Sequence, residues 1–115
     1  MKLAVAVLLE DNGSLLMIRR NRPPGIVLWE LQGGAAKKYE TAALAASREI
    51  MEEVGLTIRI IGLIGVYTEN NSESVLIVYA ASSSNLEFRI NADEVQALKF
   101  FNPGNLPKLA FQRDK

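Results

Sequence analysis

The chain has 115 residues, of which 49% are hydrophobic and 23% are charged, which is the balance of a single globular domain with its own core. Thirteen Lys and Arg offset thirteen Asp and Glu, so there is no basic excess to favour nucleic acids or membrane surfaces. The absence of cysteine and histidine excludes disulfides, thiolate zinc sites and the commonest general base. A metal site would therefore need oxygen ligands, which Mg²⁺, Mn²⁺ and Ca²⁺ prefer.

The N-terminal apolar run, from Leu3 to Leu9, leads into a turn rather than a small-residue cleavage site. We therefore expect a strand rather than a signal peptide, a single domain over residues 1–115, and a cytoplasmic protein. Asp11-Asn12-Gly13 lies between two apolar runs, which is a strong hairpin signal. It predicts antiparallel pairing of residues 2–9 with residues 14–20.

A loop is expected next at Pro23, Pro24 and Gly25, followed by a short strand around residues 29–31 that ends at Gly33-Gly34. Residues 40–54 contain neither Gly nor Pro, and Gly55 stands where glycine commonly ends a helix. These features predict a helix from Glu40 to Val54.

Downstream of this helix, two β-branched runs at residues 56–69 and 74–84 are separated by a polar turn, which predicts a second antiparallel pair. A further strand is expected at residues 95–101, and a loop with a short helical turn at residues 102–111. Strands, helix and strands in this order predict an α+β or mixed α/β fold built on antiparallel pairing.

The predicted helix carries Glu49, Glu52 and Glu53 within an arc of about 100°. We place its apolar face on the opposite side, with Ala43, Leu44, Ser47, Ile50, Met51 and Val54. The acidic arc is interpreted either as a solvated face or as a site for a divalent cation. Like charges at this spacing repel by about 0.2–0.5 kcal/mol per pair, and the helix dipole disfavours anions near the C-terminus. Because Arg48 is the one basic neighbour, these costs favour the cation site.

The spacing of these residues is similar to the Nudix box at each defining position: Gly34, Glu40, Arg48, Glu49, Ile50, Glu52, Glu53, Gly55 and Leu56. The resemblance implies a mixed, largely antiparallel β-sheet in an α/β/α sandwich. It also implies hydrolysis of a nucleoside diphosphate linked to another group, with Mg²⁺ or Mn²⁺ as cofactor.

Positions in the box carry implied roles. Glu52 and Glu53 would be the main metal ligands, with Glu49 a third ligand or the base that activates water, and the Gly33 carbonyl would complete the coordination. Arg48 would orient a box glutamate. Glu40 would hold the loop through backbone N–H groups, and Gly34 and Gly55 would be structural.

Outside the box, Glu94 stands where the family often contributes a further glutamate, as a metal ligand or general base. The alternative is an ordinary turn carboxylate. The chain also departs from common family residues at Gln32, Lys37 and Tyr39. Lys37 and Lys38 are interpreted either as exposed loop lysines or as phosphate contacts.

Five further residues are weaker candidates. The arginines Arg19, Arg20 and Arg22 are interpreted either as phosphate contacts or as surface residues. The aromatic residues Trp29 and Tyr67 are interpreted either as base-stacking residues or as core residues.

The expected partner is a small nucleotide, with no membrane or nucleic acid, and a homodimer is left open. Nucleoside triphosphates and ADP-ribose remain equally open as substrates. A non-catalytic Nudix-fold module for nucleotide sensing or protein interaction is the alternative function. Simple Ca²⁺ binding is a third, although the chain lacks an EF-hand loop.

Overall fold

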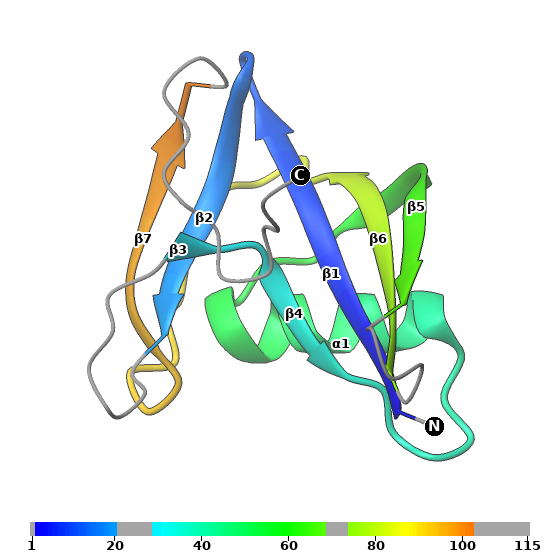
Figure 1. Ribbon diagram of the computed structural model, residues 1–115. Coiled ribbons are helices and arrows are strands. Elements are labelled where there is room, and N and C mark those ends of the chain that lie inside the picture. The colour runs from blue at the N-terminus through cyan, green and yellow to red at the C-terminus, as the bar shows by residue number, and fades with distance from the viewer. Residues whose placement is uncertain (1, 21–28, 69–73, 103–115) are drawn as a thin grey trace.

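The computed structural model describes residues 2–20, 29–68 and 74–102 (Figure 1). A mixed β-sheet and one helix make up these residues. The elements, in chain order, are β1 (Lys2–Asp11), β2 (Ser14–Arg20), β3 (Trp29–Glu30), β4 (Gln32–Ala35), α1 (Ala42–Val54), β5 (Arg59–Thr68), β6 (Ser74–Ser82) and β7 (Val95–Phe101). In the described ranges, no helix combines the length and apolar character needed to cross a bilayer.

The predicted hairpin forms, and its turn places Asn12 at φ 50° and Gly13 at φ 83°. However, β1 and β2 pair only at Glu10 with Leu15 and at Asp11 with Ser14 before they diverge. The reason is that β1 continues between β4 and β6, whereas β2 continues between β3 and β7 (Figure 1). The hairpin therefore joins two halves of the sheet.

The centre of the sheet is a parallel pair, which the sequence did not predict. β1 pairs with β6 from Lys2 opposite Ser74 to Leu9 opposite Ala81. The predicted antiparallel pair of β5 with β6 is confirmed, and it leaves β5 at the edge in the strand order β3-β2-β1-β6-β5. The strand predicted at residues 95–101 is confirmed as β7.

Alternation along β1 divides the core between the two faces of the sheet. Val5, Val7 and Leu9 point toward α1 and belong to the larger buried cluster, which also contains Ile50 and Val54. Ala6, between them, belongs to a second cluster with Met17, Leu31 and Val78. Since successive side chains of a strand point to opposite faces, β1 supports both clusters.

The helix begins at Ala42 rather than at Glu40. Thr41 is the N-cap, and its Oγ1 accepts a hydrogen bond of 3.2 Å from the Leu44 N–H. Gly55, at φ 74°, donates its N–H to the Met51 carbonyl at 3.1 Å and ends the helix as predicted. Glu40 therefore lies in the loop before the helix, where its side chain is free to bind that loop.

The predicted apolar face of the helix is confirmed at Ile50 and Val54 but was wrong at Leu44 and Met51. Its buried residues are Ala45, Ala46, Ile50, Glu53 and Val54. Leu44 is 62% exposed and Met51 is 47% exposed. The two small alanines allow the helix to approach β1 and β4, and this packing turns Glu53 toward the sheet.

Gly33 and Gly34 do not end a strand, as was predicted, but lie inside β4 opposite Ala6 and Val5 of β1. The loop predicted at residues 23–25, the polar turn at residues 70–73 and most of the helical turn predicted at residues 102–111 lie outside the described residues.

Candidate active site

The centre of the site is Glu53, a carboxylate that is 1% exposed. Its Oε1 accepts a hydrogen bond of 2.9 Å from the backbone N–H of Gly33. Glycine is required there, because φ is 154° and an added Cβ would lie 2.0 Å from the Val5 carbonyl oxygen. The close packing of β4 on β1 thus places a backbone donor against the buried glutamate. The contact engages the N–H of Gly33, whereas the predicted metal contact concerns its carbonyl.

Glu49 lies one turn earlier, against Gly34. A Cβ at Gly34 would lie 2.6 Å from both Cδ and Oε2 of Glu49. The absence of a side chain at Gly34 therefore makes the space that the Glu49 carboxylate occupies. The two adjacent glycines therefore act on different glutamates: Gly33 donates its N–H to Glu53, and Gly34 leaves space for Glu49.

Arg48 connects the helix to the loop in front of it. Its Nε donates to Glu40 Oε2 at 2.7 Å and its Nη2 to Glu40 Oε1 at 2.9 Å, which is a bidentate pair. Nη1 donates to Glu49 Oε1 at 2.9 Å and to Glu52 Oε1 at 2.6 Å. Nη2 also reaches the carbonyl of Ala35 at 3.1 Å. Arg48 therefore neutralises the acidic helix in part.

Glu40 holds the loop as well as the arginine, since its Oε1 accepts from the backbone N–H of Lys37 at 2.9 Å. The hydrogen bonds from Arg48, and then that from Lys37, lower the pKa of Glu40 to about 2. The same contacts with Glu40, Glu52 and Glu49 raise the pKa of Arg48 further above its usual range. Glu40 and Arg48 are therefore both charged at neutral pH, and the loop is fixed to the helix.

The carboxylate oxygens are ligands of the type that hard cations prefer, but their side chains do not form a complete coordination site. Across the described residues, no group of three His, Cys, Asp or Glu side chains is arranged to hold a metal ion. Two carboxylate oxygens, from Glu49 and Glu52, nevertheless converge on the single cationic nitrogen Arg48 Nη1. Such an anionic, all-oxygen donor set fits Mg²⁺ or Mn²⁺.

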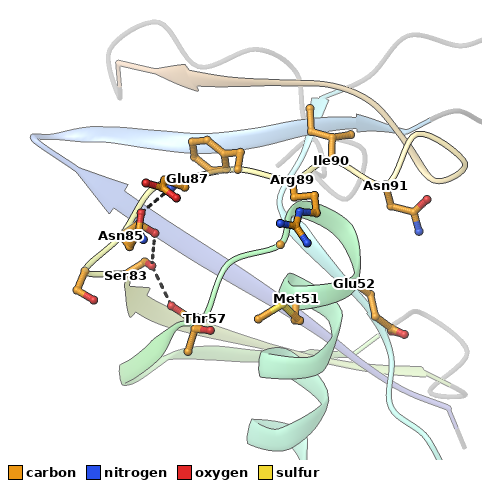
Figure 2. A pocket seen from close by; sticks show the side chains of 12 residues that line it. Met51, Glu52, Thr57, Ser83, Asn85, Glu87, Arg89, Ile90 and Asn91 are labelled. Atoms are coloured by element: carbon orange, nitrogen blue, oxygen red, sulfur yellow. Dashed lines mark hydrogen bonds between the residues drawn. The ribbon is translucent and has the colours of Figure 1, made fainter.

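The loop between β6 and β7 is joined to the C-terminal end of α1 by two backbone hydrogen bonds. The N–H of Arg89 donates to the Val54 carbonyl at 2.7 Å, and that of Asn91 donates to the Glu53 carbonyl at 3.0 Å. These bonds satisfy two of the carbonyls that a helix end leaves unpaired. They also bring the loop beside the glutamate helix (Figure 2).

Asn91, which the sequence analysis missed, organises the turn that carries Glu94. Its Oδ1 accepts from the Asp93 N–H at 3.1 Å, and its Nδ2 lies 3.5 Å from Glu94 Oε2. The backbone N–H of Glu94 bonds to the Asn91 carbonyl at 3.0 Å. Asn side chains commonly accept a hydrogen bond from the backbone N–H two residues on in a turn, so the signal was present in the sequence.

A cavity of about 730 Å³ opens where this loop meets the helix end. Its wall includes Glu52 and Met51 from α1 and Asn85, Glu87 and Arg89 from the loop (Figure 2). The sequence analysis did not identify this cavity, because it depends on the path of an irregular loop.

The weaker candidates whose side chains the structure describes are Arg19, Trp29 and Tyr67. Trp29 packs edge-on against Phe101 with ring centroids 5.0 Å apart, and the Arg19 guanidinium lies 5.5 Å from the Trp29 ring centroid. This is the core alternative for Trp29. Tyr67 is 52% exposed on the edge strand β5. Arg22 and the side chain of Arg20 lie outside the described residues.

Gln32 and Tyr39, which depart from the residues common in the family, differ in their burial. Gln32 is fully buried in β4, and its Nε2 donates to the Leu16 carbonyl at 2.9 Å. Tyr39 is 95% exposed with φ 69°, and the Lys38 ammonium lies 5.3 Å from its ring centroid. Gln32 is therefore a core residue, whereas Tyr39 is a loop residue open to solvent.

Comparisons with known proteins agree with this architecture. A family model described as the NUDIX domain matches residues 1–115. An ADP-ribose pyrophosphatase of Methanocaldococcus jannaschii is 35% identical over 118 residues, covering 97% of this chain and 69% of the relative. A Bacillus subtilis protein, provisionally named 8-oxo-dGTP diphosphatase, is 31% identical over 104 residues, covering 90% of this chain and 68% of the relative.

The fold is confirmed by a solved structure. The crystal structure of a MutT NUDIX hydrolase from Burkholderia pseudomallei superposes with a TM-score of 0.81 and 30% identity, covering 93% of this chain and 87% of that one. With the box, the sheet topology and the family model in agreement, the chain belongs to the Nudix hydrolase family.

Proposed function

We propose that this Nudix hydrolase cleaves the diphosphate linkage of a nucleoside diphosphate derivative by attack of an activated water, with Mg²⁺ or Mn²⁺ as cofactor. The observation that carries the proposal is the convergence of Glu49 and Glu52 oxygens on one cationic nitrogen, beside the buried Glu53. The substrate class is supported by the names of the two relatives, which refer to ADP-ribose and to a nucleoside triphosphate.

In this proposal Glu49, Glu52, Glu53 and the Gly33 carbonyl hold the metal ion. When bound, the ion neutralises charge on the diphosphate and lowers the pKa of a water molecule. The chain's own groups fix the ligands before substrate arrives. Gly33 N–H holds Glu53, and Arg48 holds Glu49 and Glu52.

Arg48 is a positioning residue in this proposal, because its bidentate pair with Glu40 fixes the guanidinium that orients the helix carboxylates. Glu94 is proposed as the proton acceptor for the attacking water or as a further ligand. It is exposed, and the turn that carries it is bonded through Asn91 to the Glu53 carbonyl. Glu94 can therefore be held near α1 although it is not a residue of that helix.

The proposal is tested by separating nucleotide products chromatographically after incubation with Mg²⁺ or Mn²⁺. Substrates should include nucleoside triphosphates, ADP-ribose, dinucleoside polyphosphates and nucleotide sugars. The key variant is Glu53→Gln, which keeps a carbonyl oxygen to accept from Gly33. Glu10→Gln, on the exposed end of β1, is the matched control.

Wild type and Glu10→Gln should hydrolyse at least one substrate at equal rates. Glu53→Gln should lose at least about a hundredfold, since loss of even an outer partner of a metal ligand costs about 10–100-fold. No product from any substrate with either metal would contradict the proposed activity and favour a non-catalytic Nudix module. Equal rates for Glu53→Gln and wild type would instead contradict the role given to Glu53.

A further inference from the structure

Gln32 and Glu53 are the two buried polar residues in the part of the chain that the structure describes, with 0% and 1% of their surface exposed. They lie on the same side of the sheet, because Gln32 is opposite Val7 of β1, whose side chain points toward α1. Gly33 connects them, since it follows Gln32 in the chain and donates its N–H to Glu53 at 2.9 Å. A shift of Gln32 would therefore move the donor that holds Glu53.

Gln32 stands where the chain crosses from one half of the sheet to the other. β3 ends at Glu30 and pairs with β2, whereas β4 begins at Gln32 and pairs with β1, with Leu31 between the two strands. The pairing of β1 with β2 stops at Glu10 and Leu15, so the two halves have diverged at this point. The position of the crossing therefore sets the register of β4 on β1.

The side chain of Gln32 fixes this crossing. Its Nε2 donates to the Leu16 carbonyl at 2.9 Å, so the first residue of β4 is bonded to β2 while it is paired with β1. The bond lies one residue beyond the last pair of β1 with β2. An apolar side chain of similar size could fill the same space but would not bond β4 to β2.

Stability does not account for an amide at this position. Among the described residues, Gln32 Oε1 is a buried acceptor without a hydrogen-bond partner. Such an acceptor costs free energy at least comparable with the net gain from one hydrogen bond. The Nε2 bond and the unpaired Oε1 therefore largely cancel in the free energy of unfolding. The effect that remains is geometric, because the bond holds the start of β4 in place.

The contact with Glu53 requires β4 to stay in this register. An added Cβ at Gly33 would lie 2.0 Å from the Val5 carbonyl oxygen, so the chain fits here only with glycine opposite this part of β1. A slip of one residue would move β4 by about 3.3 Å along β1 and exchange the faces of its side chains. The Gly33 N–H would then no longer face Glu53.

We propose that Gln32 is a positioning residue: its amide anchors the start of β4 to β2 and thereby holds the Gly33 N–H against Glu53. The catalytic consequence rests on the proposed function, because it takes Glu53 to be a metal ligand. The placement of Gly33 does not rest on it, since this placement is a property of the chain on its own.

The first test uses the protein without metal. Gln32→Met and Gln32→Leu remove the donor and keep a side chain of similar size. Leu31→Met, at the neighbouring buried residue of the other core cluster, is the matched control. NMR spectra of isotope-labelled protein give the chemical shift and the hydrogen-exchange rate of the Gly33 amide. The amides of β6, the central partner of β1, report global opening.

Both Gln32 variants should shift the Gly33 amide resonance and raise its exchange rate about five- to tenfold, as expected for the loss of one hydrogen bond. The β6 amides should exchange as in wild type, and Leu31→Met should leave the Gly33 amide unchanged. An unchanged Gly33 amide in both Gln32 variants, an equal effect in Leu31→Met, or equally faster exchange in β6 would overturn the inference. Failure of both Gln32 variants to fold would also overturn it, because Gln32 would then be required for the fold itself.

The second test measures the consequence for the site. Binding of Mn²⁺ is followed by electron paramagnetic resonance of the free ion, and kcat and KM are measured on the best substrate. The Gln32 variants should bind Mn²⁺ about tenfold more weakly and lose about 10–100-fold in kcat, as is usual when the partner of a metal ligand is disturbed. KM for the nucleotide should stay unchanged, because Gln32 is fully buried and does not reach substrate.

The two tests separate this inference from the proposed function. Wild-type values of kcat and Mn²⁺ affinity in both Gln32 variants would contradict the inference. If the Gly33 amide responds as expected but wild type hydrolyses no substrate, the proposed function fails and the placement of Gly33 by Gln32 stands. If wild type is active and the Gly33 amide does not respond, the reverse is true.

Discussion

Gly34→Ala should remove most of the activity while the protein stays folded. The added Cβ would lie 2.6 Å from Glu49 Cδ and Oε2 and 2.9 Å from Oε1, below the 3.4 Å at which ordinary contacts begin. The carboxylate must therefore move by roughly 0.8 Å. Gly34 does not have a positive φ, so alanine can adopt its backbone conformation, and the flexible Glu49 side chain takes up the clash.

The expected magnitudes differ between activity and stability. A displacement of about 1 Å in a reacting or ligating group costs about 100-fold in rate. Loss of the Arg48 contact with Glu49, whose side chains are 21% and 15% exposed, should cost about 1 kcal/mol at most in unfolding free energy. The variant is thus expected to lose catalysis much more than stability.

The assay is the measurement of kcat on the best substrate together with the melting temperature, with Gly33→Ala as the matched variant. At Gly33 the clash is with backbone, because the added Cβ would lie 2.0 Å from the Val5 carbonyl oxygen. That variant should lose about 3 kcal/mol or more in unfolding free energy. Unchanged kcat in Gly34→Ala, or a melting temperature as low as that of Gly33→Ala, would refute the reasoning.

Three further predictions concern stability. The pKa of Glu40 is lowered from 4.5 to about 2, so its contribution is complete above about pH 4.5 and is lost as the pH falls toward 2; Glu40→Gln should flatten the acid unfolding curve in that window, as followed by circular dichroism. Thr41→Ala should lower the unfolding free energy by about 1 kcal/mol in urea titrations, whereas Thr41→Ser should preserve it because the hydroxyl cap remains. Ile50→Ala should cost about 2–5 kcal/mol in the same titration, and an equal loss in Leu44→Ala, which truncates an exposed side chain, would contradict the observed orientation of the helix.

Local signals in the sequence predicted most of the elements. Asn12-Gly13 adopts the positive φ angles of a tight hairpin turn, and Gly55 ends the helix in the left-handed conformation. Both depend on the conformational freedom of one or two residues, so neighbouring sequence is sufficient to recognise them. The spacing of the glutamates likewise identified the family, because a fixed spacing on one helix sets which side chains lie near each other.

The orientation of the helix could not be predicted in this way. On a helical wheel the larger apolar residues Leu44 and Met51 suggested one buried face, but the helix packs through Ala45, Ala46 and Ile50. The close approach of β4 determines the orientation of the helix, because its backbone supplies a donor to Glu53 on the face of α1 that packs against the sheet. A buried carboxylate is stable only with such a partner, and the partner is 20 residues away in the sequence.

The path of the β6–β7 loop was beyond local reasoning for a related reason. Its apolar residues Leu86, Phe88 and Ile90 alternate with polar residues, which is typical of a strand, yet residues 85–90 form no strand. The contacts that place the loop include backbone bonds from Arg89 and Asn91 to the helix carbonyls. Every residue type except proline has both of these backbone groups, so the sequence does not indicate which residues will form such bonds.

The parallel pairing of β1 with β6 also bears on how the chain folds. Lys2 through Leu9 find their central neighbours only at Ser74 through Ala81, so the middle of the sheet cannot close until residue 81 has been synthesised. Contacts of such high sequence separation slow folding, because the loop between them must be ordered first. Until then β1 has an unpaired apolar edge. The nascent chain is therefore most prone to aggregate in the interval between the completion of α1 and the addition of β6.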